Sequence, residues 1–214
     1  MIFISASQPI IAFKEIFFEL YNSSIKSFDP KHWKEHTATI EILVNQLEYI
    51  NPVFINNQTI EYAFDYKKYF PSVKDKVISD EIEYYSQKFL TSNTINTIIE
   101  HLQKDKFSKR AVLNFWKPEF LNPETTSVCV SSCYFRIKDN FLELHSHSRA
   151  NNLFFLTLID MQMMIGFQYY VAKQLGLNIG TYLHFFDSIH FFTRDIDMIN
   201  EQYNFIKGNP MWKF

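Results

Sequence analysis

Glycine is scarce in this chain, and its distribution limits which folds the chain can adopt. Only four glycines occur among 214 residues, and all of them fall in the last quarter: Gly166, Gly176, Gly180 and Gly208. The first 165 residues therefore cannot form a glycine-rich loop that cradles phosphate on backbone N–H groups. This excludes the P-loop and the dinucleotide-binding fingerprint there, so a bound phosphate would have to be held by cationic side chains.

The composition predicts one folded domain spanning residues 1–214. Hydrophobic residues make up 47% and aromatic residues 18% of the chain, which is enough to build a core. A formal net charge of −2 gives no electrostatic reason to expect a nucleic-acid partner. No internal repeat or linker divides the chain, so we expect a single domain.

The sequence also bears on compartment. No basic segment precedes an apolar stretch at Met1, which predicts no secretory signal. The most apolar window, 153–170, is interrupted by Asp160, so we expect no membrane span. Cys129 and Cys133 lie too close in one expected strand for a comfortable disulfide. We therefore expect a cytoplasmic protein.

Hydrophobic periodicity and turn residues predict an α+β fold. Helices are expected at Ile10–Leu20, Thr37–Tyr49, Ile95–Leu102, Leu158–Leu175 and Asp195–Phe205. Strands are expected at Ala111–Trp116, Ser127–Ile137, Phe141–Ser148, Tyr182–Phe186 and Ile189–Thr193. Asp139-Asn140 is expected to turn a hairpin, and Gly176 to end a helix in the left-handed conformation. The segment Pro52–Val77 has no clean period.

A series of polar residues runs through the strand-rich half of the chain. Cys129 is followed by Arg149 at 20 residues, Asp160 at 31 and His190 at 61. With the basic pair Lys109-Arg110 upstream, this series resembles the nucleotide site of the thymidylate synthase superfamily. The segments Ser148-Arg149-Ala150, Leu158-Ile159-Asp160 and Ser188-Ile189-His190-Phe191-Phe192 resemble its Gln-Arg-Ser, Pro-Phe-Asn and Gly-Asp-x-His-x-Tyr motifs.

The resemblance implies a thymidylate synthase-like fold: a mixed sheet packed by helices, with one sheet face forming a homodimer interface. It implies that Arg149 grips the phosphate of a nucleoside monophosphate, while Lys109 and Arg110 reach across to the partner's phosphate. It also implies that Glu15, on the first helix, handles water and protons, and that Asn152 lies near the folate.

Several positions depart from the family pattern. The residues flanking the cysteine are Val128 and Val130, Ala150 follows the clamp arginine, and Phe192 replaces a sugar-reading tyrosine. Ser188 and Asn152 stand where the family has aspartates. A phosphate loop before the first helix and a closing C-terminal tail have no counterpart here, so we expect a shortened, divergent member.

The candidate nucleophile is Cys129. A thiolate added at pyrimidine C6 makes C5 nucleophilic towards the methylene of 5,10-methylenetetrahydrofolate, and a neighbouring arginine would favour the thiolate. The alternative is that Cys129 is a small buried hydrophobe on a strand. Cys133, on the same strand face, is expected to be packing.

Asp160 is the candidate base reader. Asparagine suits uracil because its amide both donates and accepts, whereas a carboxylate accepts from the cytosine N4 amino group and can share a proton with N3. Cytidylate hydroxymethylases of this superfamily resemble thymidylate synthases with aspartate here. The alternative is a helix N-cap.

The remaining candidates also have plain structural explanations. His190 would lie beside the sugar hydroxyl, but it could equally be structural. Glu15 could simply occupy the solvated face of its helix. Glu143, His145 and His147 alternate along one strand, as metal ligands or as a solvated or subunit-facing strand would. We expect no metal site.

These observations favour a pyrimidine-nucleotide C5 hydroxymethyltransferase acting on dCMP or CMP with 5,10-methylenetetrahydrofolate. One alternative is a thymidylate synthase that methylates dUMP. The other is a catalytically degenerate nucleotide-binding or dimerisation module of the same fold.

Overall fold

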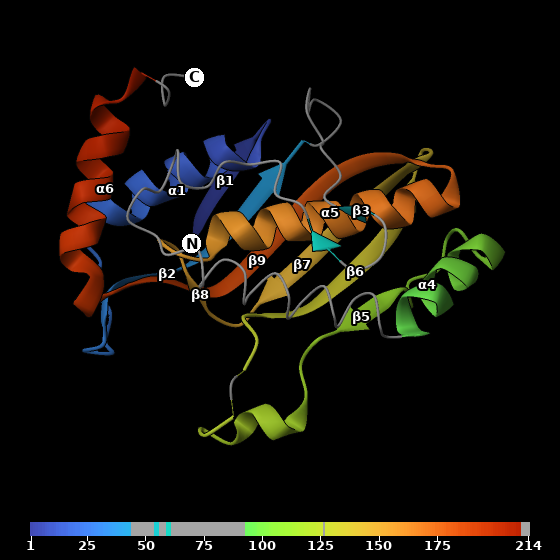
Figure 1. Cartoon of the computed structure of the whole chain (residues 1–214), viewed down its shortest axis with the longest axis horizontal. Coiled ribbons are helices and arrows are strands. Elements are labelled where there is room, and N and C mark those ends of the chain that lie inside the picture. Colours follow the sequence, from blue (N-terminus) through green and yellow to red (C-terminus); the bar gives the residue numbers. More distant parts are fainter. Residues whose placement is uncertain (44–53, 56–58, 61–92, 126, 211–214) are drawn as a thin grey trace.

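The computed structural model describes residues 1–43, 54–55, 59–60, 93–125 and 127–210. A seven-stranded mixed sheet forms its centre (Figure 1). Six strands follow the order β1-β2-β9-β7-β6-β5, and the short β8 pairs with β9. Their bounds are β1 Ile2–Ala6, β2 His32–Ile42, β5 Val112–Asn114, β6 Val130–Lys138, β7 Phe141–Ser148, β8 Asn151–Asn152 and β9 Asn178–Phe192. A separate two-stranded sheet pairs β3 (Phe54–Ile55) with β4 (Thr59–Ile60).

The sheet contains both parallel and antiparallel strand pairs. β9 runs parallel to β7 and antiparallel to β2, and β6 runs antiparallel to both β7 and β5. The start of β6, the end of β7, the end of β9 and the start of β2 therefore lie at the same end of the sheet. We call this row of strand ends the site edge. The opposite edge, the turn edge, contains the Asp139-Asn140 turn, whose residues have φ of 49° and 66°.

Helices cover one face of the sheet. α1 (Pro9–Asn22) and the long α5 (Thr157–Leu175) contact each other and the strands beneath them (Figure 1). α4 (Asn93–Lys104) packs beside β5 and α5, and α6 (Ile196–Gly208) lies at the other end of the molecule. Large buried side chains between α1, α5 and the sheet form the core: Phe13, Phe17, Phe135, Phe154, Phe167, Phe186 and Phe191. The α+β architecture with a mixed, helix-packed sheet is thus confirmed.

Most predicted elements are confirmed. α1, α4, α5, α6 and the β6–β7 hairpin lie within a few residues of their predicted bounds. Gly176 caps α5 with φ of 67°, and the N–H of Leu177 bonds back to Ala172. Cys133 is buried in the core as predicted, and burial raises the pKa of its thiol.

The predicted helix over Thr37–Tyr49 is wrong in its first part, since residues 37–42 belong to β2. Thr37, Thr39, Ile40 and Ile42 are β-branched, which favours an extended chain, and β2 pairs with β1 on one side and β9 on the other. The remainder of that prediction, and nearly all of Pro52–Val77, lie outside the described residues.

The two short strands predicted near the C-terminus form one strand, β9, of 15 residues. The predicted break survives as a bulge, because β2 advances two residues from His36 to Ala38 while β9 moves three, from Ile189 to Phe186. A second irregularity follows between His32 and Lys34. His190 lies between the two, where the local twist re-aims side chains.

Within the described residues, no helix has both the length and the apolarity needed to cross a membrane.

Candidate functional site

The site edge brings together residues that are far apart in the sequence. Cys129 immediately precedes β6, Arg149 immediately follows β7, and the backbone N–H of Arg149 donates to the carbonyl of Cys129 at 3.2 Å. The hairpin therefore fixes these two residues against each other. Cys129 is half-buried, so its thiol lies at the margin of the folded core.

The Arg149 side chain is held by several groups. Its Nε donates to the Val128 carbonyl at 3.1 Å, and Nη2 donates to the Ser127 hydroxyl. The guanidinium carbon lies 5.3 Å from the centre of the Trp116 ring, within cation–π range. These contacts place a fixed positive charge beside the segment that ends in Cys129.

Asp160 lies in the first turn of α5 and is fully buried. The amide Nδ2 of Asn151 donates to its Oδ2 at 2.6 Å, and the Asn151 Oδ1 accepts a hydrogen bond from the Thr157 hydroxyl. The N-cap of α5 is Leu156, and the Asp160 N–H already bonds to the Leu156 carbonyl. The alternative role of Asp160 as an N-cap is therefore wrong.

Asn152 and His190 are neighbours because β8 pairs with β9 in that register. The Asn152 Oδ1 accepts the Phe154 N–H at 3.2 Å, and the His190 carbonyl accepts the Leu153 N–H at 3.0 Å. The first bond lies within the segment 151–156, which leads into α5, and the second ties that segment to the end of β9. The two predicted binding residues thus share one corner of the site edge.

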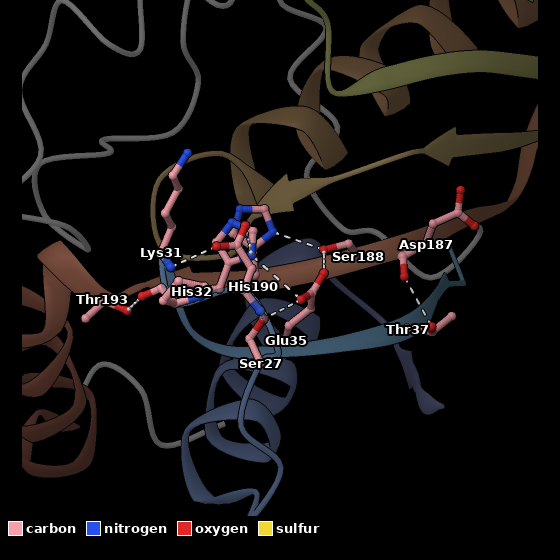
Figure 2. Close-up of polar contacts among 11 residues, drawn as sticks. Ser27, Lys31, His32, Glu35, Thr37, Asp187, Ser188, His190 and Thr193 are labelled. Atoms are coloured by element: carbon pink, nitrogen blue, oxygen red, sulfur yellow. Dashed lines mark hydrogen bonds and ion pairs between the residues drawn. The ribbon is translucent and has the colours of Figure 1, made fainter.

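His190 also lies near polar side chains of β2, of β9 and of the segment before β2 (Figure 2). Its ring stacks on His32 with centroids 4.0 Å apart, and its Nδ1 lies 3.3 Å from the Ser188 hydroxyl. Ser188 donates to Glu35 at 2.5 Å, and Ser27 donates to the other oxygen of Glu35 at 2.6 Å. We call His32, Glu35, Ser188 and His190 the histidine cluster.

The electrostatics of the histidine cluster favour neutral His190. Burial lowers the pKa of His190 to about 4, with further lowering from His32 and Arg149 and an opposing effect from Glu35. Hydrogen bonds from Ser188 and Ser27 lower the pKa of Glu35, which is therefore ionised. At neutral pH, His190 is thus an uncharged donor and acceptor that is suited to binding a hydroxyl.

A second buried chain of hydrogen bonds lies under α5. Ser148 Oγ lies 2.7 Å from the His184 Nε2, and the Tyr182 hydroxyl lies 2.7 Å from the His184 Nδ1. Burial lowers the pKa of His184 to about 3. Burial raises the pKa of Tyr182, and the charge of Asp160 adds to that effect.

Lys109 and Arg110 lie away from this cluster. Both are exposed, and Ala111, the next residue, bonds through its carbonyl to the N–H of Phe135. Phe135 is six residues along β6 from Cys129, which at about 3.3 Å per residue is roughly 20 Å. Lys109 lines a groove of about 860 Å³ at the turn edge, together with the cationic residues Lys106, Arg136 and Lys138.

Glu15 lies on the exposed face of α1. The hydrogen bonds described above do not connect it to the site edge.

The metal hypothesis concerned Glu143, His145 and His147. The described residues contain no group of three or more His, Cys, Asp or Glu side chains placed to hold an ion. Glu143 instead lies 3.6 Å from Arg136 and 3.8 Å from His145.

Sequence reasoning missed the contributions of His32, Glu35 and Asn151. His32 and Glu35 belong to β2, whose strand character was not recognised, so their approach to β9 was not foreseen. The signal for Asn151 was its place beside Asn152 at a strand-to-helix junction, where short amides commonly bond to nearby groups.

Comparison with known proteins adds the family relationship. A model of the family described as thymidylate synthase matches residues 21–209. One relative is a protein of Methanocaldococcus jannaschii that is provisionally named a thymidylate synthase. It is 32% identical over 117 residues, which cover 52% of this chain and 53% of that protein. The thymidylate synthase of Listeria monocytogenes is 21% identical over 112 residues, covering 52% of this chain and 36% of that protein.

Among solved structures, the thermostable thymidylate synthase A of Bacillus subtilis aligns with a TM-score of 0.46 and 22% identity, over 51% of this chain and 39% of that one. The aligned regions thus span about half the length of the archaeal relative and about a third of the length of the bacterial ones.

Proposed function

Since this chain belongs to the thymidylate synthase family, we propose that it is a folate-dependent one-carbon transferase that hydroxymethylates C5 of a cytidylate, dCMP or CMP. The observation that carries this proposal is the convergence of Cys129, Arg149, Asp160 and His190 on the site edge. A nucleophile, a fixed cation, a buried carboxylate and a neutral histidine are the groups that this chemistry needs.

In the proposed mechanism, the Cys129 thiolate adds to C6 of the pyrimidine, and the electron pair of the C5=C6 bond becomes available at C5. Arg149 favours the thiolate and binds the phosphate. C5 bonds to the methylene carbon that the cosubstrate would supply, and the two bonds from that carbon to folate nitrogens are replaced by N–H bonds. The C5 proton and one water proton account for those two N–H bonds, the hydroxyl of the water ends on the transferred carbon, and Cys129 leaves C6. The products are a 5-hydroxymethylcytidylate and tetrahydrofolate, so the atoms balance with one water consumed.

The family relationship implies 5,10-methylenetetrahydrofolate as the cosubstrate, which supplies the methylene carbon when bound. Asn152 is the residue proposed to hold it, because it lies beside His190 and within the 151–156 loop. Its amide oxygen bonds to Phe154, so Nδ2 is the donor that it would offer. Asn152 therefore fits in position, but it provides an N–H where the family pattern has a carboxylate.

In this proposal, Asp160 determines which pyrimidine base the site binds. Facing a cytosine, it accepts from the N4 amino group and shares a proton with N3, whereas an ionised Asp160 facing uracil O4 would place two acceptors together in a buried site. Glu15 keeps its proposed role in handling water and protons, which requires that the substrate complex bring it near the base. His190 binds the sugar hydroxyl.

We further propose a homodimer in which Lys109 and Arg110 serve the partner's phosphate. Their separation from Cys129 supports action on another chain. The sheet face opposite α1 and α5 supports a contact surface, because a row of residues in register crosses it: Phe3, Thr39, Phe185, His147 and Ser132. Phe3 is 60% exposed and Phe185 is 40% exposed, which is typical of an apolar surface that pairs.

The test uses dCMP, CMP and dUMP tritiated at C5, each with 5,10-methylenetetrahydrofolate, followed by the mass of the product. Tritium release from a cytidylate with a hydroxymethyl product is the expected result. Release from dUMP alone with a methyl product would replace the proposal with thymidylate synthesis. Nucleotide binding without any release would indicate a non-catalytic binding module.

A further inference from the structure

Asn151 and Thr157 form a buried pair beside Asp160. Asn151, Thr157 and Asp160 are each fully buried. Thr157 donates to the Asn151 Oδ1, so the Asn151 amide must direct its Nδ2 towards Asp160, where it donates to Oδ2 at 2.6 Å. Thr157 thereby fixes the orientation of the amide, and the amide in turn fixes Asp160.

This arrangement makes the two oxygens of Asp160 different from each other. If they were equivalent, Asp160 could not distinguish cytosine from uracil. A carboxylic acid can carry its proton on either oxygen. With the proton opposite base position 3, it donates to N3 of cytosine and accepts from N4–H. With the proton opposite position 4, it donates to O4 of uracil and accepts from N3–H. An unrestrained Asp160 could therefore bind both bases.

We propose that Asn151, oriented by Thr157, is the positioning residue that makes Asp160 select cytosine over uracil. Because the Asn151 N–H donates to Oδ2, that oxygen stays an acceptor and the shared proton is confined to Oδ1. Oδ2 has a second lone pair for the N4 amino group, while Oδ1 shares its proton with N3. Uracil would then set its O4 acceptor against the Oδ2 acceptor.

The other groups near Asp160 are compatible with this role. The Tyr182 phenol, on β9, stays protonated, since burial raises its pKa and the charge of Asp160 adds to that effect, and it is engaged with His184 Nδ1 at 2.7 Å. His184 is neutral because burial lowers its pKa to about 3. The hydrogen bond from Asn151 thus distinguishes Oδ2 from Oδ1.

This inference rests on the proposed function, but its test can separate the two. The dissociation constants of dCMP and dUMP are measured calorimetrically on the full chain without folate, and tritium release is measured separately. Asn151→Leu removes the amide at similar volume, Thr157→Val removes the orienting hydroxyl, and Thr157→Ser retains it as the matched control. The pH dependence of dCMP binding is recorded for each variant.

We expect the dUMP-to-dCMP ratio of dissociation constants to fall by at least about 10-fold in Asn151→Leu, by less in Thr157→Val, and to stay unchanged in Thr157→Ser. Without the amide donor, the proton is held more tightly, so the alkaline limb of dCMP binding should move to higher pH.

An unchanged ratio and pH profile in Thr157→Val and Asn151→Leu would overturn the inference, even if stability fell. If Asn151→Leu does not fold, the Thr157→Val and Thr157→Ser pair decides the question alone. Selective dCMP binding that depends on Thr157 would uphold the positioning role. If no tritium were released in the same experiments, only the proposed function would fail.

Discussion

The site edge and the turn edge of the same sheet handle polar groups in opposite ways. At the site edge, Asp160, Asn151 and His190 are buried, and each is held by hydrogen bonds from the protein. At the turn edge, Lys109 and its neighbouring cations are exposed around an open groove. Buried polar groups lose little further freedom on binding, so the site edge is suited to the base discrimination that we propose. The exposed cations are suited to attracting a phosphate.

The largest expected effect comes from Cys129 at the site edge. Cys129→Ala should abolish tritium release from C5, a loss of more than about 1,000-fold, because no other described side chain is proposed to add at C6. Nucleotide affinity, measured by calorimetry, should change less than about 3-fold. Cys133→Ala is the control, since that thiol is buried and its raised pKa keeps it protonated. Turnover surviving in Cys129→Ala would remove the nucleophile from the site edge.

Asp160→Asn tests the second part of the site edge. While Asn151 donates to the atom opposite base position 4, the new amide must keep its oxygen there and its N–H opposite position 3, so Asp160→Asn alone should still prefer dCMP in kcat/KM. Combined with Asn151→Leu, the amide can turn its N–H towards uracil O4, and the preference between dCMP and dUMP should reverse. A change of about 1,000-fold in the ratio is expected in the double variant, as for other mispaired polar groups in buried sites. Steady-state kinetics with both nucleotides measures it, and a ratio that does not change in the double variant would make Asp160 purely structural.

Arg149→Lys asks whether geometry matters as well as charge. Lysine cannot reproduce the hydrogen bonds from Nε to Val128 and from Nη2 to Ser127. We expect kcat/KM to fall by about 100-fold and the free energy of unfolding by about 1–2 kcal/mol. Arg136→Lys at the turn edge is the matched control, and equal losses in both variants would contradict the special role of Arg149.

Mixing variants tests whether the two edges cooperate between chains. Arg110→Ala and Cys129→Ala should each be inactive alone. Random exchange of subunits should restore about a quarter of the wild-type activity, because half of the dimers are then mixed and each mixed dimer has one intact site. Mixing Cys129→Ala with Lys207→Ala gives a reference value. No recovery in the first mixture would mean that Arg110 does not act on the partner's site, and full activity of Arg110→Ala alone would place Arg110 outside the proposed site.

The last prediction concerns the free energy of unfolding at acid pH. The folded-state pKa values of His184 and His190 are lowered to about 3 and about 4, below the usual 6.5. The unfolded chain therefore takes up protons that the folded chain excludes, and stability falls as pH drops from 6.5 towards 4. Each histidine contributes about 1.4 kcal/mol per pH unit.

Urea unfolding between about pH 7 and pH 5 measures this loss, and His184→Gln should remove about half of the dependence on pH. A variant with the wild-type pH dependence would mean that His184 is protonated in the folded state.

Local signals in the sequence were sufficient for the parts of the fold that form from local interactions. The Asp139-Asn140 turn, the Gly176 cap and the periodicity of α5 predicted the hairpin and the helix that hold Cys129, Arg149 and Asp160. β2 was missed because its strand character depends on pairing with β1 and β9, which lie far away in the sequence.

The candidate site divides in the same way. The spacing from Cys129 to His190 indicated the residues that the structure gathers at the site edge. The partners of those residues could not be found by spacing, since Glu35 reaches Ser188 only through the pairing of β2 with β9, and Asn151 reaches Asp160 only once the 151–160 segment closes. Such contacts form only when the chain folds back on itself, so no periodic pattern in the sequence predicts them.

The most direct test of the central claim is to look for a covalent bond between Cys129 and a cytidylate. A 5-fluoro cytidylate can undergo addition at C6 but cannot lose fluorine as a cation, so with 5,10-methylenetetrahydrofolate the adduct should accumulate. Peptide mass spectrometry should find the nucleotide on the peptide containing Cys129, and none after Cys129→Ala. If the protein carried no nucleotide after the incubation, or carried it on Cys133, the account would be contradicted.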